Sequence, residues 1–221
     1  GKFAAAYTSF EQAASYADIR AICRTARDFN ITPMVRVTQN EPALITRALD
    51  CGAMGVVAPR VHSAEQARAA VRMMRYTPEG DRGFGMHSIM TNFEWGDPVA
   101  MMEETNRETL AVLQVESQEA VDSIEAIAAT PGLDALFIGP YDLSISMGIA
   151  EQFRGPRFWD AVERVAAACR ANGIATAIQT GDPWVLQEAR RRGVRMLICS
   201  GDFAVLFAAY KDKLAEMKEG E

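Results

Sequence analysis

Leu113-Gln114-Val115-Glu116-Ser117 and Leu136-Phe137-Ile138-Gly139-Pro140-Tyr141-Asp142 are the two segments that decide the fold of this chain. Each is a short apolar run that ends in polar side chains, and a stretch of helical period separates them. Similar apolar runs, bounded by Gly or Pro and separated by amphipathic stretches, recur along the sequence, which is the pattern of repeated β–α units. We therefore predict an α/β fold with parallel strands, closed into a (β/α) barrel.

The same pattern gives the bounds of the individual elements. Strands are predicted at Ala4–Thr8, Thr32–Val37, Gly55–Ala58, Leu110–Val115, Ala135–Ile138, Ala175–Gln179 and Met196–Cys199, with Arg82–Met86 a loop or a weak strand. Helices are predicted at Tyr16–Phe29, Pro42–Asp50, Ala64–Met74, Pro98–Thr109, Gln118–Ala129, Arg157–Ala171 and Pro183–Arg192. The strands number about one short of the eight in a complete barrel. We expect a single domain over residues 1–221, because this length suits one barrel.

Composition and charge exclude several classes of partner and site. The chain is 49% apolar with a formal net charge of −6, and its basic residues are interleaved with acidic ones, so neither nucleic acid nor membrane is an expected partner. It has no apolar run of membrane-spanning length and no secretory pattern at Gly1–Tyr7, so we expect a cytoplasmic protein. With two histidines and four scattered cysteines, any metal must be held mostly by oxygen.

Polar side chains at strand ends are the first candidates for chemistry, because functional residues of α/β barrels lie at the carboxyl ends of the strands. Gln114 and Glu116 are two positions apart at the end of a strand, so both should point into the barrel. Gly139 and Pro140 form a turn that delivers Asp142 beside Glu116, and Gly139 allows close approach of a ligand to the backbone.

Two neighbouring carboxylates raise each other's pKa unless a cation lies between them. The pair Glu116 and Asp142 therefore indicates a divalent cation, and oxygen ligands with few histidines favour Mg²⁺ or Mn²⁺ over zinc. The alternative is that Glu116 caps a helix starting near Ser117 and that Asp142 caps a helix at Leu143. Spacing alone leaves both interpretations open.

Three further features of the sequence lie near predicted strand ends. Arg36 follows a strand and suits an anion or a developing enolate, or else it forms a structural ion pair with Glu116 or Asp142. The glycines of Arg82-Gly83-Phe84-Gly85 suggest unusual backbone angles near the barrel mouth, or ordinary loop geometry. His87 follows this loop and is either a substrate contact or a solvated side chain.

Several of these motifs, in this order, resemble those of the HpcH/HpaI class II aldolases, which are metal-dependent. The resemblance runs over nearly the whole chain. It is strongest in Gln114-Val115-Glu116-Ser117 and in Phe137-Ile138-Gly139-Pro140-Tyr141-Asp142-Leu143-Ser144, with support from Val35-Arg36-Val37, Ala58-Pro59-Arg60-Val61 and Arg82-Gly83-Phe84-Gly85. It implies a (β/α)8 TIM barrel of the phosphoenolpyruvate/pyruvate type, whose first strand and helix this chain lacks.

The resemblance also implies a reaction and roles for individual residues. Glu116 and Asp142 would ligate Mg²⁺ or Mn²⁺, and Arg36 and Gln114 would contact a 2-oxo acid substrate whose carboxylate lies near the turn formed by Gly139, Pro140, Tyr141 and Asp142. The implied reaction is reversible aldol cleavage of a 4-hydroxy-2-oxo acid to pyruvate and an aldehyde through a metal-stabilised enolate. A homo-oligomer, a hexamer in the resembled family, is implied as well.

One departure from the family pattern concerns proton transfer. The family carries an Asp-x-Glu-His motif after an early strand, and the corresponding residues here are Ser9-Phe10-Glu11-Gln12. Glutamine is no general base near neutral pH, and serine has no imidazole to orient. Two alternatives to an aldolase therefore stay open: an oxaloacetate-type decarboxylase, which forms the enolate without a base, and a non-catalytic protein that binds metal and oxo acid.

Overall fold

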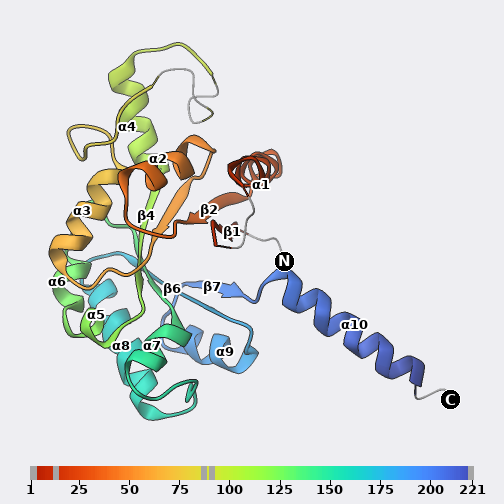
Figure 1. The fold of residues 1–221 in the computed structure, drawn as a ribbon. Helices are drawn as coiled ribbons and strands as arrows, with labels where there is room; N and C mark the ends of the chain where they lie inside the picture. The colour runs from red at the N-terminus through yellow and green to blue at the C-terminus, as the bar shows by residue number, and fades with distance from the viewer. Residues whose placement is uncertain (1–3, 12–14, 86–88, 90–92, 219–221) are drawn as a thin grey trace.

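Seven parallel strands form the sheet of the described residues. The computed structural model describes residues 4–11, 15–85, 89 and 93–218. Its strands are β1 (Ala5–Ser9), β2 (Thr32–Arg36), β3 (Gly55–Ala58), β4 (Leu110–Val115), β5 (Ala135–Ile138), β6 (Ala175–Thr180) and β7 (Met196–Cys199). They pair in chain order from β1 to β7 (Figure 1), which confirms the predicted α/β barrel architecture.

The helices lie outside this curved sheet (Figure 1). They are α1 (Tyr16–Asp28), α2 (Pro42–Asp50), α3 (Ala64–Met74), α4 (Pro98–Glu108), α5 (Gln118–Asp122), α6 (Ile124–Ala128), α7 (Pro140–Ser146), α8 (Pro156–Ala171), α9 (Pro183–Arg191) and α10 (Asp202–Lys218). Among the described residues, no helix combines the length and the apolar character that crossing a bilayer requires.

Three differences from the predicted helices are informative. The single helix predicted at Gln118–Ala129 is wrong, because Ser123 both ends α5 and begins α6. The predicted helices did not include α7, which begins directly in the Gly139-Pro140 turn and not at Leu143 as in the cap alternative, or α10, which is the last helix of the described chain. Residues 82–85 form no strand.

Successive side chains along each strand point to opposite faces of the sheet, and the buried side chains on the two faces form two separate cores. Side chains facing the barrel interior form one cluster of buried residues: Met34, Val57, Val112, Ala135, Phe137 and Ala177. The residues between them on the same strands, such as Val35, Leu113 and Ile138, belong to a larger cluster packed against the helices. Because the strand period is two, the next inward position beyond each interior residue lies at the carboxyl end of the barrel.

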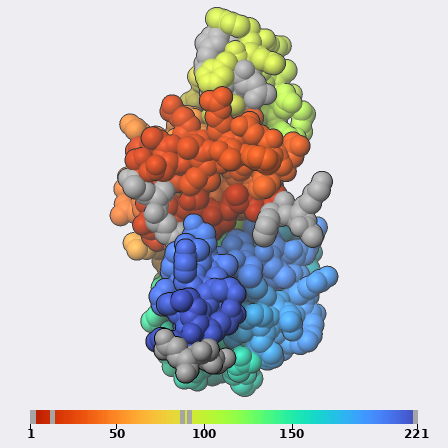
Figure 2. Space-filling model, turned by 90° about the vertical axis from the view of Figure 1, so that its right-hand side faces the viewer, coloured from red at the N-terminus to blue at the C-terminus, as the bar shows by residue number. Residues whose placement is uncertain are grey.

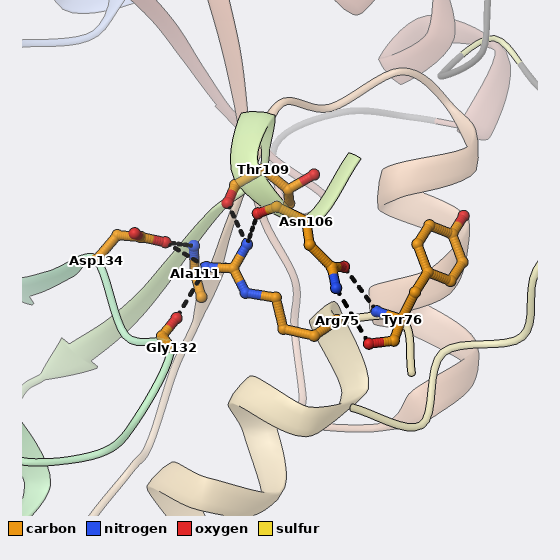
Figure 3. A network of polar contacts seen from close by, with 7 residues as sticks. All are labelled: Arg75, Tyr76, Asn106, Thr109, Ala111, Gly132 and Asp134. Carbon is orange, nitrogen blue, oxygen red and sulfur yellow. Dashed lines mark hydrogen bonds and ion pairs between the residues drawn. The ribbon is translucent and has the colours of Figure 1, made fainter. Parts of the chain in front are cut away.

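A buried arginine ties the opposite, amino-terminal ends of the strands together (Figure 3). Arg75, which follows α3 and is 3% exposed, donates to the carbonyl oxygens of Asn106, Thr109 and Gly132 and to the carboxylate of Asp134. The Asp134 carboxylate also accepts from the N–H of Ala111, 2.7 Å away. This network joins the segments that enter β4 and β5, so it holds the end of the barrel that is distant from the strand carboxyl ends.

The loop Arg82–Gly85 belongs to that amino-terminal side, which corrects its predicted place near the mouth. Arg82 pairs at 2.9 Å with Asp50, the last residue of α2, and its guanidinium lies over the Tyr76 ring. α2 follows β2 and runs back antiparallel to it, so Asp50, at the end of α2, lies at the amino-terminal side of the strands, and Arg82 lies there with it. Neither Gly83 nor Gly85 has a positive φ, so the expectation of unusual backbone angles at these glycines is wrong.

Candidate active site at the carboxyl ends of the strands

Arg36, Gln114 and Glu116 all lie on the interior face at the carboxyl end of the barrel. Arg36 is two positions beyond the interior residue Met34, and Gln114 is two beyond Val112. Gln114 is 3% exposed, whereas Glu116 is half-buried just beyond the end of β4. The predicted inward direction of Gln114 and Glu116 is confirmed by their mutual hydrogen bond.

Hydrogen bonds fix the Glu116 carboxylate on both oxygens. Its Oε2 accepts from Nε2 of Gln114 at 2.6 Å, and its Oε1 accepts from the backbone N–H of Arg60 at 2.7 Å. Arg60 follows β3 with a φ of 55°, the left-handed conformation that turns its N–H toward Glu116. Sequence reasoning missed this contact, because a backbone donor leaves no signal in residue type. The Oε1 of Gln114 is buried and has no hydrogen-bond partner.

Gly139 lies against these two side chains, and its lack of a Cβ makes that approach possible. A Cβ at Gly139 would lie 2.8 Å from Nε2 of Gln114 and 3.2 Å from Cβ of Glu116. Gly139 is the N-cap of α7, with Pro140 next, so Tyr141 and Asp142 fall in the first helical turn. Both Tyr141 and Asp142 are exposed at this end of the barrel.

The interpretation of Glu116 and Asp142 as helix caps is wrong. Ser117 caps α5 through its side chain, which accepts from the N–H of Ala120, and Gly139 occupies the cap position of α7. Neither carboxylate is used to end a helix, so both remain available at the mouth.

The electrostatics of this carboxylate pair fit a cation. Burial is the main cause that raises the pKa of Glu116, and the nearby Asp142 carboxylate raises it further, while the Arg60 N–H and the Arg36 charge lower it. In the described ranges, no three His, Cys, Asp or Glu side chains cluster. Two carboxylates and the unpartnered Gln114 oxygen are nevertheless oxygen donors of the kind that Mg²⁺ and Mn²⁺ accept, with further positions for water or substrate.

Arg36 is held by a carboxylate that the sequence analysis did not single out. Its Nη2 donates to Oε2 of Glu11, which follows β1, so the predicted alternative of an ion pair with Glu116 or Asp142 is wrong. The Arg36 side chain is 17% exposed and its Nε atom is buried without a hydrogen-bond partner. Glu11 therefore orients the guanidinium through Nη2, and the buried Nε keeps its N–H available for another group.

The positions of the family's proton-transfer motif are described only in part. Ser9 is buried, and its hydroxyl accepts from the N–H of Glu11 at 3.1 Å. Gln12 and His87 lie outside the described residues. Tyr7, two positions before Ser9, stacks on Phe137 inside the barrel, and burial raises the pKa of its phenol to about 12. Tyr7 therefore stays protonated near neutral pH.

Gln179 is a second polar residue of the mouth that sequence reasoning missed. It follows the interior positions Ala175 and Ala177 of β6 by the strand period, and it is half-buried. The pairing of Ile138 with Ile178 makes Gly139, directly beyond the end of β5, the lateral neighbour of Gln179. The strand period in Ala175-Thr176-Ala177-Ile178-Gln179 places Gln179 on the same side as Ala175 and Ala177, so this pattern would have predicted its inward direction.

Comparison with known proteins identifies the family of this site. Residues 9–202 match the model of the HpcH/HpaI aldolase/citrate lyase family. The chain is 32% identical over 203 residues, 92% of its length and 79% of the relative's, to a 2-dehydro-3,6-dideoxy-6-sulfogluconate aldolase from Pseudomonas putida. It is 33% identical, over 84% of its length and 69% of the relative's, to a 2-keto-3-deoxy-L-rhamnonate aldolase from Salmonella gallinarum.

A solved structure agrees with these sequence matches. The HpcH/HpaI aldolase from Desulfitobacterium hafniense superposes with a TM-score of 0.90 at 34% identity, covering 96% of this chain and 83% of that one. The matched segment contains β2 to β7 and all of the mouth residues described above. This chain is thus a carbon–carbon lyase, and it belongs to the HpcH/HpaI aldolase/citrate lyase family.

Proposed function

We propose that this chain cleaves a 4-hydroxy-2-oxo acid reversibly to pyruvate and an aldehyde, with Glu116 and Asp142 holding Mg²⁺ or Mn²⁺. The observation that carries the proposal is the pair of buried, unpartnered polar atoms at the mouth, Oε1 of Gln114 and Nε of Arg36. Unpaired buried polar atoms are costly, and at a functional site they mark the place of a ligand or ion. Oε1 of Gln114 is an acceptor and suits a cation beside the two carboxylates, whereas Nε of Arg36 is a donor and suits a substrate oxygen that carries negative charge.

The residues of the chain have distinct tasks in this proposal. Arg36, oriented by Glu11, donates through Nε to the oxygen on which negative charge develops as the enolate forms. Gln114 holds Glu116 in place, and its unpartnered Oε1 would be available as a further oxygen donor to the ion. When bound, the cation supplies electrophilic stabilisation of the enolate's negative charge.

The turn after β5 offers donors for the substrate carboxylate. The N–H of Gly139 donates to the carbonyl of Val115, and Pro140 has no N–H, so the donors left to this turn are those of Tyr141 and Asp142. First-turn N–H groups of a helix have no partner within the helix and attract anions. We therefore place the carboxylate of the oxo acid at Tyr141 and Asp142.

Oxaloacetate decarboxylation is the second candidate function, and the position of Ser9 favours it. Its hydroxyl is buried and already accepts from the Glu11 N–H, and a serine hydroxyl does not remove protons near neutral pH without a base. Loss of carbon dioxide forms the same enolate without proton abstraction. The names of the relatives, which specify aldolases of deoxy sugar acids, support aldol cleavage as the first candidate.

Metal titration combined with two substrates tests the proposal. Glu116→Ala and Asp142→Ala should each abolish calorimetric Mn²⁺ binding and metal-dependent pyruvate release from both a 4-hydroxy-2-oxo acid and oxaloacetate. Asp160→Ala, an exposed carboxylate on α8, is the matched control and should leave both unchanged. Unchanged Mn²⁺ affinity in the Glu116 and Asp142 variants would refute the site. If wild type binds Mn²⁺ but releases no pyruvate from either substrate, the proposed reaction is wrong and the chain only binds the metal.

A further inference from the structure

One peptide group beyond the end of β3 is held from both sides. Its carbonyl oxygen, that of Pro59, accepts a hydrogen bond from Nδ2 of Asn40 at 2.6 Å. Its N–H, that of Arg60, donates to Oε1 of Glu116 at 2.7 Å. Because the carbonyl and the N–H of a trans peptide lie in one plane and point in opposite directions, fixing the carbonyl also fixes the direction of the N–H. Asn40 and Glu116 are therefore connected through a single rigid group.

This peptide leads into a backbone conformation that is unfavourable for its residue. Arg60 has a φ of 55°, in the left-handed region, where the Cβ of an ordinary residue lies too close to the following carbonyl oxygen. A strained conformation persists where surrounding contacts determine it, and such residues gather at functional sites. The hydrogen bonds of this peptide with Asn40 and with Glu116 are contacts of that kind.

The order of the sheet brings Asn40 to this peptide. Asn40 comes four residues after the end of β2 and directly before Glu41, the N-cap of α2. β2 pairs with β3 in parallel, so the segments that follow the two strands are neighbours at the carboxyl end of the barrel. Figure 2 shows the amino-terminal part of the chain, to which Asn40 belongs, as one packed red and orange mass above the blue carboxyl-terminal part. Asn40 is half-buried within it.

The hydrogen bonding of Asn40 is incomplete in a way that stability does not explain. A carbonyl needs a donor, so Nδ2 is the atom of the amide that faces Pro59. The other atom, Oδ1, is buried and has no hydrogen-bond partner within the described chain. A buried acceptor without a partner destabilises the folded state. An asparagine with one unused polar atom at this position therefore points to a task for its other atom.

The segments after β3 and β4 are joined a second time, close to Glu116. Nδ1 of His62 lies 2.9 Å from Oγ of Ser117, the residue that caps α5. This contact keeps the two segments together, but it leaves the direction of the Arg60 N–H to the rotation of the Pro59–Arg60 peptide. The hydrogen bond from Asn40 is on the group whose rotation decides that direction.

We propose that Asn40 is a positioning residue of the mouth: by holding the Pro59 carbonyl it keeps the Arg60 N–H on Oε1 of Glu116, and so keeps the carboxylate in one orientation for a cation. The inference rests on the proposed function, because it takes Glu116 as a metal ligand. Gln114 holds the other oxygen, Oε2, so the two contacts together direct the whole carboxylate. Removing a hydrogen-bond partner that orients a metal ligand typically lowers metal affinity about 10- to 100-fold.

Metal titration of two Asn40 variants tests the effect on the site. Asn40→Ala, and Asn40→Leu, which fills the space, should each raise the calorimetric Kd for Mn²⁺ about 10- to 100-fold, while kcat at saturating Mn²⁺ stays within about threefold of wild type. A residue with a merely structural role would lower the folded fraction in urea and leave the Kd of the folded chains unchanged. Wild-type Mn²⁺ affinity in both variants would overturn the proposal.

Asn172→Ala is the matched control for these variants. Asn172, the C-cap of α8, also donates its Nδ2 to a backbone carbonyl, that of Ala168 at 2.9 Å. It precedes β6 by three residues, at the amino-terminal side of the strands, so its loss should leave Mn²⁺ affinity unchanged. A rise in Kd equal to that of the Asn40 variants would show an unspecific effect and refute the proposed connection.

The amide resonance of Arg60 separates this inference from the proposed function. In metal-free protein labelled with [¹⁵N]arginine, the signal that is lost in Arg60→Lys should lie downfield, because a charged acceptor strengthens the hydrogen bond. Asn40→Ala and Glu116→Gln should each move it upfield, and Asn172→Ala should not. A signal that Asn40→Ala leaves in place overturns the positioning role, whether or not wild type binds Mn²⁺. If the signal moves but wild type binds no Mn²⁺, the hold of Asn40 on Glu116 is supported and the metal site is wrong.

Discussion

Replacing Gly139 by alanine is the sharpest test of the geometry at the mouth. Its φ of −90° is allowed for alanine, so the backbone itself is not strained. The new Cβ would lie 2.8 Å from Nε2 of Gln114, and reaching an ordinary contact of 3.4 Å requires a displacement of about 0.6 Å. Gln114 is 3% exposed and cannot yield outward, so the shift passes to its 2.6 Å hydrogen bond with Glu116.

The expected consequences are larger for chemistry than for folding. Overpacking of this kind costs about 1–3 kcal/mol, which lowers the melting temperature of a chain of this size by roughly 2–12 °C. A displacement approaching 1 Å in a positioned group lowers kcat/KM by about a hundredfold. Steady-state cleavage of a 4-hydroxy-2-oxo acid and calorimetric melting measure the two effects.

Gly83→Ala is the matched control for this variant. Its Cβ would meet nothing within 4 Å and its φ is not positive, so both quantities should stay at wild-type values. If Gly139→Ala keeps kcat/KM within about threefold of the Gly83→Ala value, the close packing of Gly139 on Gln114 has no part in the reaction, and the proposed role of that amide is wrong.

Three further variants test separate parts of the molecule. Arg36→Lys should lower kcat/KM at least about tenfold, since a point charge lacks the planar fork held by Glu11; a loss under about threefold contradicts its proposed role. Because the folded state binds the Glu116 proton more tightly than the unfolded state, metal-free Glu116→Gln should melt higher than wild type at neutral pH. That advantage should vanish as the pH falls below the ordinary glutamate value of 4.5; an advantage that is constant with pH in calorimetry would refute this cause. Arg75→Met should lose about 1–3 kcal/mol of unfolding free energy in urea, because the carbonyl oxygens of Asn106 and Thr109 lose their buried donor, while kcat/KM of the folded fraction stays unchanged.

Strand positions were predictable because apolar runs bounded by Gly or Pro are a local signal. Gly55–Ala58, Leu110–Val115, Ala135–Ile138 and Met196–Cys199 are confirmed to the residue. Helix starts with side-chain caps are equally local: the side chains of Ser63 and Asp97, residue types that favour the N-cap position, cap α3 and α4. The helix α10 was missed because its even distribution of apolar residues lacks the one-sided period by which surface helices are recognised.

The candidate site was predictable where side chains project by strand period, and not where a contact is made across the sheet. The inward direction of Gln114 and Glu116 followed from a separation of two residues. The pairing of Arg36 with Glu11 joins positions 25 residues apart, and residue type alone did not select Glu11 over Glu116 or Asp142 as its partner. The backbone N–H of Arg60 is invisible to any argument from side chains.

The order of the strands bears on how this chain acquires its structure. Each strand from β1 to β7 pairs with the next one along the chain, so every ladder of the described sheet joins segments separated by a single connection. Pairing with the next strand along the chain keeps the loop-closure entropy of each step smaller than pairing between distant strands would. A nascent chain that emerges amino-terminus first, at about 5–20 residues per second, can add one strand and its helix at a time to the growing edge. The exposed edge of each partial sheet is the template for the next strand to be synthesised. Pairing with that strand of the same chain can therefore form before the edge pairs with another molecule.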